Sequence, residues 1–297
     1  MGIDINGVRL MIAAKKNGAK FDEMLTLGRQ ILNVYPLKLA RLLKQHGLPN
    51  ETFLRAGPEC GVGDTFFEVL GAKKVSAMDN SDYEGAAFIH DLNRPVPDEL
   101  KNRFDAVYDG GTLEHVFNFP VALQSCMEMV RPGGRLYMHT IANNQCGHGF
   151  YQFSPELFFR ALSPENGFEI ERVIMHVIGP YGRWREVNDP DKIGARVTLM
   201  YPAPVHMLIQ ARKTAVKPIF ARMPFQSDYS VTWRKHADTQ VDAAAKAAPK
   251  TITMDWPWLS KYLPGLARLL HVLRMGWMFF TEHSFRNRRF YRPVRKD

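Results

Sequence analysis

Short apolar runs alternate along the first 213 residues with segments in which apolar positions recur at helical spacing. Continuous apolar runs of this length are typical of strands buried on both faces, whereas recurrence at every third or fourth position is typical of helices that pack by one face. Strands are therefore predicted at residues 24–27, 74–79, 86–91, 104–109, 135–142, 167–178 and 204–213, and helices at 37–46, 120–130 and 154–162.

Strands that alternate with helices predict an α/β fold, a Rossmann-like parallel sheet with helices on both faces. The last two strands, 167–178 and 204–213, have no crossover helix between them. Parallel neighbours need such a crossover, so we expect these two strands to form an antiparallel hairpin at one edge of the sheet. Residues 179–203 are then an insertion within the hairpin.

Composition divides the chain into three parts. Of its 297 residues 45% are hydrophobic, enough for one large domain with an appendage. Residues 1–213 are predicted to form the Rossmann domain. Residues 214–252 contain an Ala-rich polar stretch and are expected to be a linker. Residues 253–297 form a basic, aromatic extension that is predicted to be helical.

The extension carries most of the charge. The net charge of the chain is +9, and residues 256–297 contribute +7 of it. Their apolar and aromatic positions recur at helical spacing, with Trp258 and Trp277 among them. One interpretation is a helix that packs on the domain and ends in a solvated basic segment. Another is a peripheral anchor whose arginines contact anionic lipid head groups. Nucleic-acid binding is not expected, because no recognised module accompanies the charges.

The expected compartment is the cytoplasm, with contact to the inner face of the membrane through the extension. The three cysteines share no metal-site spacing and are too few for a disulfide framework. Asp4 stands where a signal peptide would need an apolar run. No run of 18 apolar residues is present.

Acids or glycines follow four of the predicted strands. Ligands of open parallel sheets bind at the carboxyl ends of the strands, and glycines there let the backbone approach a ligand closely. A carboxylate after the second strand can accept hydrogen bonds from ribose hydroxyls, and one after the third can accept one from an adenine amino group. Asp at a strand end is also a common turn former. The residues are Gly28, Arg29 and Gln30, then Asp79, then Asp91, then Asp109, Gly110 and Gly111.

Two segments resemble a known family. KVSAMDNSDYEGAAFIHDLN (74–93), followed by FDAVYDGGTLEHVFNFPVALQSCMEMVRPGG (104–134), resembles the central part of class I S-adenosylmethionine-dependent methyltransferases. The resemblance implies a seven-stranded sheet with an antiparallel last strand, and S-adenosylmethionine as cofactor. It also implies that Asp79 holds the ribose, that Asp91 and Leu92 contact the adenine, and that residues 109–113, Gly110 and Gly111 included, line the methionine side.

The family's first-strand motif, an acid followed by glycines, has no good copy here. CGVGD (60–64) has the composition, but no apolar strand precedes it. LTLGRQ (25–30) is a proper strand that ends in one glycine, with residues 31–73 as an enlarged crossover. We favour LTLGRQ, which assigns Gly28 and Gln30 to the cofactor site.

Three side chains are candidates for catalysis. Glu114 and His115 follow the glycines, and His148 lies between two glycines after the next strand. Methyl transfer requires positioning and removal of a proton from an oxygen or nitrogen nucleophile, and a histidine with a pKa near neutrality suits the latter. Structural alternatives are an acid favoured by a helix N-terminus for Glu114 and a capping role for His115. The three could also hold a divalent metal. Related enzymes that do so carry a further acid where this chain has Gly111, so no metal is expected.

The sequence therefore favours a methyltransferase acting on an O or N nucleophile of a small molecule or a glycan or lipid precursor. The alternative is a non-catalytic protein of the same fold that serves as a scaffold in a biosynthetic complex. A nicotinamide-dependent oxidoreductase is not supported, because the G-x-G-x-x-G fingerprint is absent. An anionic or sugar-bearing acceptor would suit four side chains of the insertion, namely Tyr181, Arg183, Trp184 and Arg185.

Overall fold

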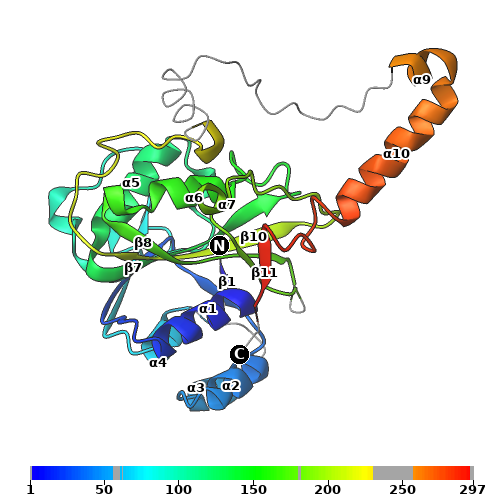
Figure 1. The fold of residues 1–297 in the computed structure, drawn as a ribbon. Coiled ribbons are helices and arrows are strands. Elements are labelled where there is room, and N and C mark those ends of the chain that lie inside the picture. The colour runs from blue at the N-terminus through cyan, green and yellow to red at the C-terminus, as the bar shows by residue number, and fades with distance from the viewer. Residues whose placement is uncertain (1, 56–60, 62, 180–181, 230–256, 295–297) are drawn as a thin grey trace.

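A central sheet organises the molecule. The computed structural model describes residues 2–55, 61, 63–179, 182–229 and 257–294 (Figure 1). Nine strands in these residues form one sheet in the order β11-β9-β8-β10-β7-β6-β2-β4-β5. The bounds are β2 Glu23–Leu27, β4 Lys74–Asp79, β5 Phe88–Ile89, β6 Phe104–Asp109, β7 Val130–Asn143, β8 Phe168–Val177, β9 Arg185–Val187, β10 Val205–Lys213 and β11 Tyr291–Pro293.

The mostly parallel α/β sheet agrees with the sequence. The parallel part of the sheet consists of β5, β4, β2, β6 and β7, and each strand in it runs parallel to the next. β10 is antiparallel to both β7 and β8, so the hairpin of the last two predicted strands is present. Its predicted place at the edge was wrong, because β9 from the insertion pairs with β8 and β11 from the extension pairs with β9. The sheet thus exceeds the seven strands expected.

Helices cover both faces (Figure 1). One hydrophobic core joins the sheet to α5 and α6, and the other joins it to α1, α2 and α4. Their bounds are α1 Ile5–Lys16, α2 Pro36–Gln45, α3 Glu51–Arg55, α4 Asp64–Val69, α5 Phe119–Met129, α6 Pro155–Ala161 and α7 Pro190–Ile193. Single 3-10 turns lie at Asp98–Leu100, Leu113–His115 and Pro164–Asn166, and β1 (Gly2–Asp4) pairs with β3 (Ile31–Asn33) in a separate small sheet.

Helix α1 was not expected from the sequence. Asp4 caps it, with its Oδ1 accepting hydrogen bonds from the backbone N–H groups of Asn6 and Gly7 at 2.8 and 2.9 Å. Eight of its twelve residues are buried, including Asn6 and Gly7. A helix buried on so many sides has no clean polar face, which explains why periodicity did not reveal it.

The first strand of the main sheet is β2, which lies in the segment LTLGRQ favoured from the sequence. β2 ends at Leu27, and Gly28 follows with a φ of +66°. The crossover to β4 contains β3, α2, α3 and α4, so it is enlarged as expected. No described strand immediately precedes α4.

The C-terminal extension has two structural parts. Helices α9 (Pro257–Tyr262) and α10 (Pro264–Phe280) project from the domain, and the chain then returns to add β11 to the sheet (Figure 1). Tyr291 of β11 is fully buried. Within the expected linker, residues 214–229 follow the domain surface, where Ser227 bonds to Glu156 on α6 at 2.8 Å. Residues 230–252 lie outside the described residues. None of the helices in the described parts of the chain combines the length and hydropathy needed to cross a bilayer.

Candidate functional site

Gln30 occupies the end of the first strand. Its Nε2 donates to the carbonyl oxygens of Leu27 and Gly28 at 2.7 and 3.2 Å, and the side chain is fully buried. Its Oε1 lies against Gly110, where a Cβ atom would overlap it. That oxygen has no hydrogen-bond partner within the described residues. A side-chain acceptor therefore stands where the family places glycine backbone.

Arg29, which the sequence did not single out for a role, ties the first strand to two other segments. Its guanidinium forms an ion pair with Asp64 at the start of α4, with 3.0 Å between Nη1 and Oδ2. Its Nε and Nη2 donate to the backbone oxygens of Glu84 and Gly85 after β4 at 2.8 and 3.2 Å. In addition, the N–H of Gly63 donates to the carbonyl of Gln30 at 2.8 Å. The two candidate glycine motifs of the sequence thus meet in space.

The expected nucleoside acids differ in their surroundings. Asp79 ends β4 at a partly exposed position and accepts a hydrogen bond from the N–H of Asn80 at 2.6 Å. Asp91 accepts two bonds from Asn93, at 2.9 Å from its N–H and 2.8 Å from its Nδ2, and these bonds lower the pKa of Asp91. Leu92 is buried in the core. The Asp91 carboxylate is thus engaged in its own turn, whereas that of Asp79 is partly exposed at the C-terminal end of β4.

Asp109 and Glu114 form a buried acidic pair. Asp109 is fully buried, and its Oδ1 accepts from the N–H groups of Thr112 and Leu113 at 2.7 and 3.4 Å. Burial and the Glu114 carboxylate raise the pKa of Asp109 to about 8. Burial also raises the pKa of Glu114, whose Oε2 accepts from the Thr140 hydroxyl at 2.9 Å. At neutral pH the pair therefore retains a proton.

The structure brings the three candidate catalytic residues together. The rings of His115 and His148 have centroids 5.0 Å apart, and His148 Nε2 lies 4.0 Å from Glu114 Oε1. Both histidines are exposed, whereas Glu114 is buried beneath them. Burial, followed by the neighbouring His148, lowers the pKa of His115. Two imidazoles at this edge are thus available to solvent and to an acceptor.

The loop that carries His148 is held on the turn that carries His115. The N–H groups of Phe150 and Tyr151 donate to the Glu114 carbonyl at 2.8 and 3.3 Å. Gly149 has a φ of +75°, and a Cβ there would lie 2.7 Å from that carbonyl oxygen. Glycine is therefore required at 149 for the close approach.

Glu114, His115 and His148 also satisfy the geometry of a possible metal site. One ligand atom from each lies within 4.8 Å of the other two. The resemblance implies that metal-dependent enzymes of this kind carry a further acid at the position of Gly111. Here Gly111 has a φ of +97°, and a Cβ atom on it would lie 3.2 Å from Glu114 Oε1. The position therefore disfavours any larger residue.

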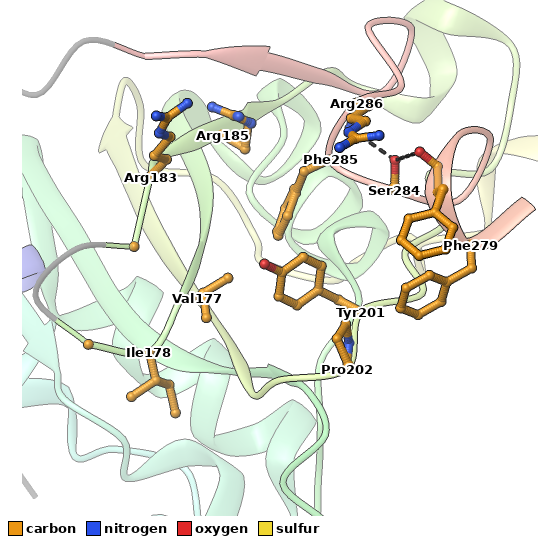
Figure 2. Close-up of a pocket in the computed structure, with 13 residues that line it drawn as sticks. Val177, Ile178, Arg183, Arg185, Tyr201, Pro202, Phe279, Ser284, Phe285 and Arg286 are labelled. Carbon is orange, nitrogen blue, oxygen red and sulfur yellow. Dashed lines mark hydrogen bonds between the residues drawn. The ribbon is translucent and has the colours of Figure 1, made fainter. Parts of the chain in front are cut away.

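A cavity of about 650 Å³ opens at the same edge of the sheet, beyond β10 (Figure 2). Its walls come from the end of β8, the start of β9, the approach to β10 and the turn after α10. Arg183 and Arg185 line it as the sequence suggested, and none of its arginines forms an ion pair within the described residues. The residues drawn are Val177, Ile178, Gly179, Gly182, Arg183, Arg185, Tyr201, Pro202, Phe279, Phe280, Ser284, Phe285 and Arg286.

Of the other two insertion residues, only Trp184 is described, and it does not line this cavity. Trp184 is buried and its Nε1 donates to Asn6 Oδ1 at 3.0 Å, so its side chain faces the α1 side of the sheet. Tyr181 lies outside the described residues. The extension supplies Phe285 and Arg286 instead. Burial, followed by the like charges of Arg183 and Arg288, lowers the pKa of Arg185, which indicates a cationic cluster that no acid compensates within the described residues.

Comparison with known proteins adds a fold-level likeness. Models of protein families and curated proteins yield no match. Among solved structures, a candidate S-adenosylmethionine-dependent methyltransferase from Listeria monocytogenes is 12% identical, with 69% of this chain and 98% of that chain covered and a TM-score of 0.39. A Burkholderia thailandensis 1,6-didemethyltoxoflavin-N1-methyltransferase with bound S-adenosylhomocysteine is 14% identical, with coverage of 70% and 78% and a TM-score of 0.37.

A third similar structure is that of a synthase. The branched-chain polyamine synthase from Thermus thermophilus, in complex with 5'-methylthioadenosine, is 13% identical, with 74% of this chain and 61% of that chain covered and a TM-score of 0.37. Structural neighbours of this chain are thus S-adenosylmethionine-dependent methyltransferases and a polyamine synthase. At identities and TM-scores this low, the likeness carries no information about the reaction of this chain.

Proposed function

We propose that the chain is an S-adenosylmethionine-dependent methyltransferase that methylates an oxygen or nitrogen nucleophile. The observation that carries the proposal is the convergence of His115 and His148 over Glu114, at the edge where β6 and β7 end. In a parallel sheet this edge is where ligands bind. Two imidazoles at such a place suit the removal of a proton from an acceptor.

The residues at the strand ends fit the cofactor. Gln30 Oε1 is a buried acceptor without a hydrogen-bond partner in the described residues, and the α-ammonium of the methionine part would supply a donor to it. Asp79, at the C-terminal end of β4, would accept hydrogen bonds from the ribose hydroxyls. The cofactor, when bound, supplies a methyl group on a sulfonium that is a good leaving group.

His115 and His148 would then act on the acceptor. His115 is neutral near pH 7, because partial desolvation and the neighbouring His148 lower its pKa. A neutral imidazole can take the proton that the acceptor loses during methyl transfer. Glu114 would not serve as the base, because it is buried and its pKa is raised. It would instead position the loop of His148 through its backbone carbonyl.

The acceptor we propose carries an anionic group. The cavity in Figure 2 combines Arg183, Arg185 and Arg286 with aromatic walls from Tyr201 and Phe285. Guanidinium groups bind phosphate or carboxylate by paired hydrogen bonds, and aromatic faces pack on rings. A phosphorylated glycan or lipid precursor has both features.

The alternative, a non-catalytic scaffold, is favoured by one observation. The side chains of Arg29 and Gln30 fill or bridge the strand ends that the family leaves to glycine backbone. A site closed by such contacts would no longer admit the cofactor. Binding of S-adenosylmethionine is therefore the measurement that separates the two functions.

Isothermal titration of the purified chain with S-adenosylmethionine and with S-adenosylhomocysteine provides the test. We expect binding to the native chain and about 10- to 100-fold weaker binding to Asp79→Ala, because a hydrogen bond to a charged group contributes about 1.5–3 kcal/mol. Asp82→Ala is the matched control, since Asp82 is an exposed acid of the same loop. Absence of heat with either ligand, in a chain that melts cooperatively, would favour the scaffold.

We also propose that the extension places the enzyme against an anionic membrane. Helix α10 has no buried residue among those described, and its exposed Leu266, Leu269, Leu273, Trp277 and Phe280 follow a helical stripe. The adjoining turn carries Arg286, Arg288 and Arg289. Apolar side chains beside arginines are typical of helices that lie in the membrane interface.

A further inference from the structure

A second histidine cluster lies at the same edge of the sheet, in residues that the proposed reaction does not use. His139, His206 and His176 come from β7, β10 and β8, which are adjacent strands. His206 pairs directly with His176 in the register, and it also pairs with Ile141, two residues from His139. One nitrogen from each ring lies within 4.8 Å of the other two. The cluster thus depends on strand pairing and not on local sequence.

The three rings are shielded from water. His139 is 7% exposed and His176 is fully buried, whereas His206 is partly exposed. The start of α1 lies over them, with Asp4 Oδ1 3.7 Å from His139 Nδ1. The cluster is therefore a buried site with access to solvent on the His206 side.

Each ring has one nitrogen directed at an oxygen that can only accept. His139 Nδ1 faces the Asp4 carboxylate, His176 Nδ1 lies 3.0 Å from the Val177 carbonyl, and His206 Nε2 lies 2.9 Å from Gln145 Oε1. These nitrogens carry the hydrogens, because a lone pair against an acceptor oxygen would be repulsive. The remaining nitrogen of each neutral ring is then a lone-pair donor.

Two of these lone pairs meet. His139 Nε2 and His206 Nδ1 are 3.1 Å apart, a contact that needs a hydrogen or a cation between them. An added proton would leave a charged ring in this buried cluster, where the loss of hydration is costly. Moving the hydrogen of His139 to Nε2 would leave a lone pair facing Asp4. A metal ion satisfies both rings without either cost.

We propose that His139, His176 and His206 bind a divalent transition-metal ion, with Zn²⁺ as the best fit. Neutral imidazole is the ligand form that Zn²⁺ prefers. At Zn–N distances of about 2.0–2.1 Å, tetrahedral ligands lie about 3.3 Å apart, close to the observed contact of 3.1 Å. Water would take the fourth position from the partly exposed side.

The outer contacts match those of metal-bound histidines. Such histidines usually donate their second nitrogen to a carboxylate, a backbone carbonyl or water, which fixes the tautomer and the ring orientation. The Val177 carbonyl is such a partner at 3.0 Å, and the Asp4 carboxylate faces its ring at 3.7 Å. The amide oxygen of Gln145 is an acceptor of similar character at 2.9 Å. The ion would join three strands and the start of α1 beside the proposed active site, and it requires no assumption about methyl transfer.

Metal titration of the tag-free chain tests the proposal. After treatment with a chelator, the chain is titrated with Zn²⁺ by calorimetry and with Co²⁺ by visible absorption. We expect one Zn²⁺ per chain, Co²⁺ bands of tetrahedral intensity and a rise in melting temperature. Gln145→Ala should weaken binding by about 10–100-fold, as loss of an outer contact does. His206→Gln should weaken it further.

His148→Gln is the matched control, because it removes a ligand from the other histidine cluster. Binding unchanged in His148→Gln and lost in His206→Gln would support the site. Absence of Zn²⁺ uptake by the native chain would overturn the proposal. Equal binding by native chain and His206→Gln, or loss of binding in His148→Gln alone, would also overturn it. Circular dichroism of each variant establishes that it is folded.

Discussion

Asp109 shows how one buried carboxyl can set the response of the fold to pH. Its pKa is raised to about 8 from the ordinary value of 3.8, which means that between these values the folded chain retains a proton that the unfolded chain releases. Unfolding then releases protons between these two values, so the stability contributed by this proton is complete below about pH 3.8 and is lost as the pH rises toward 8.

We therefore expect the stability of Asp109→Asn to increase relative to that of the native chain as the pH rises. An Asn oxygen can still accept from the N–H groups of Thr112 and Leu113, and the amide has no proton to lose. Thermal melts from about pH 5 to pH 8 should show a difference in melting temperature that grows in favour of the variant. Asp98→Asn, at an exposed acid, should give a curve parallel to the native one. A constant difference for Asp109→Asn would contradict the raised pKa.

Residue-level predictions depended on proximity in sequence. Glu114 and His115 were found because they directly follow a strand, and His148 because glycines flank it. The cluster of His139, His176 and His206 gave no such signal, since only the register of β7, β10 and β8 brings the rings together. The bridging contacts of Arg29 were likewise missed, because its partners belong to other segments.

At the scale of elements, strand β9 contributes to one wall of the cationic cavity, and β11 supports that strand from its other side. Arg185 is the first residue of β9, and β11 pairs with that strand. Because Arg185 is partly buried and has no acid partner within the described residues, it should contribute strongly to the binding of an anion.

We expect Arg185→Ala to weaken the binding of anionic sugars. Sugar phosphates and nucleotide sugars, screened by thermal shift and titrated by calorimetry, serve as probes. A ligand found in this way should bind about 10-fold or more weakly to the variant, since a charged hydrogen bond contributes about 1.5–3 kcal/mol. Arg212→Ala is the control, because Arg212 pairs with Glu169 at the opposite end of β10. Equal losses in both variants would argue against the cavity as the binding site.

The sequence predicted seven of the nine strands of the main sheet, because apolar runs and turn residues mark them. The prediction at 86–91 was too long, since only Phe88–Ile89 (β5) form a strand there. The sequence did not predict β9 or β11, each of three residues, because so short a strand has no periodicity and is defined only by its partner. It did not predict α1 for the opposite reason, since burial on most sides removes the polar face that periodicity detects.

At the scale of the whole molecule, the projecting helix α10 is the feature that a compact domain would not need. We expect the chain to sediment with vesicles containing anionic phosphatidylglycerol and not with vesicles of phosphatidylcholine alone, and the binding should weaken as salt rises. Leu273→Ser combined with Trp277→Ser should reduce sedimentation strongly, because both side chains are exposed on α10.

Tyr83→Ser is the matched control for this measurement, since Tyr83 is 90% exposed on the loop after β4. Sedimentation that is indifferent to lipid charge, or unchanged in the α10 variant, would exclude the membrane as the partner. Self-association that disappears in the same variant would instead identify a second copy of the chain.

The turn after α10 has a consequence for how the two ends of the extension communicate. Phe279 and Phe280 end the helix and Phe285 begins the return to β11, and all three are walls of the cavity. A surface that binds the helix and a ligand that binds in the cavity therefore contact one shared segment. If surface binding raises the affinity for the ligand by some factor, ligand binding must raise the affinity for the surface by the same factor.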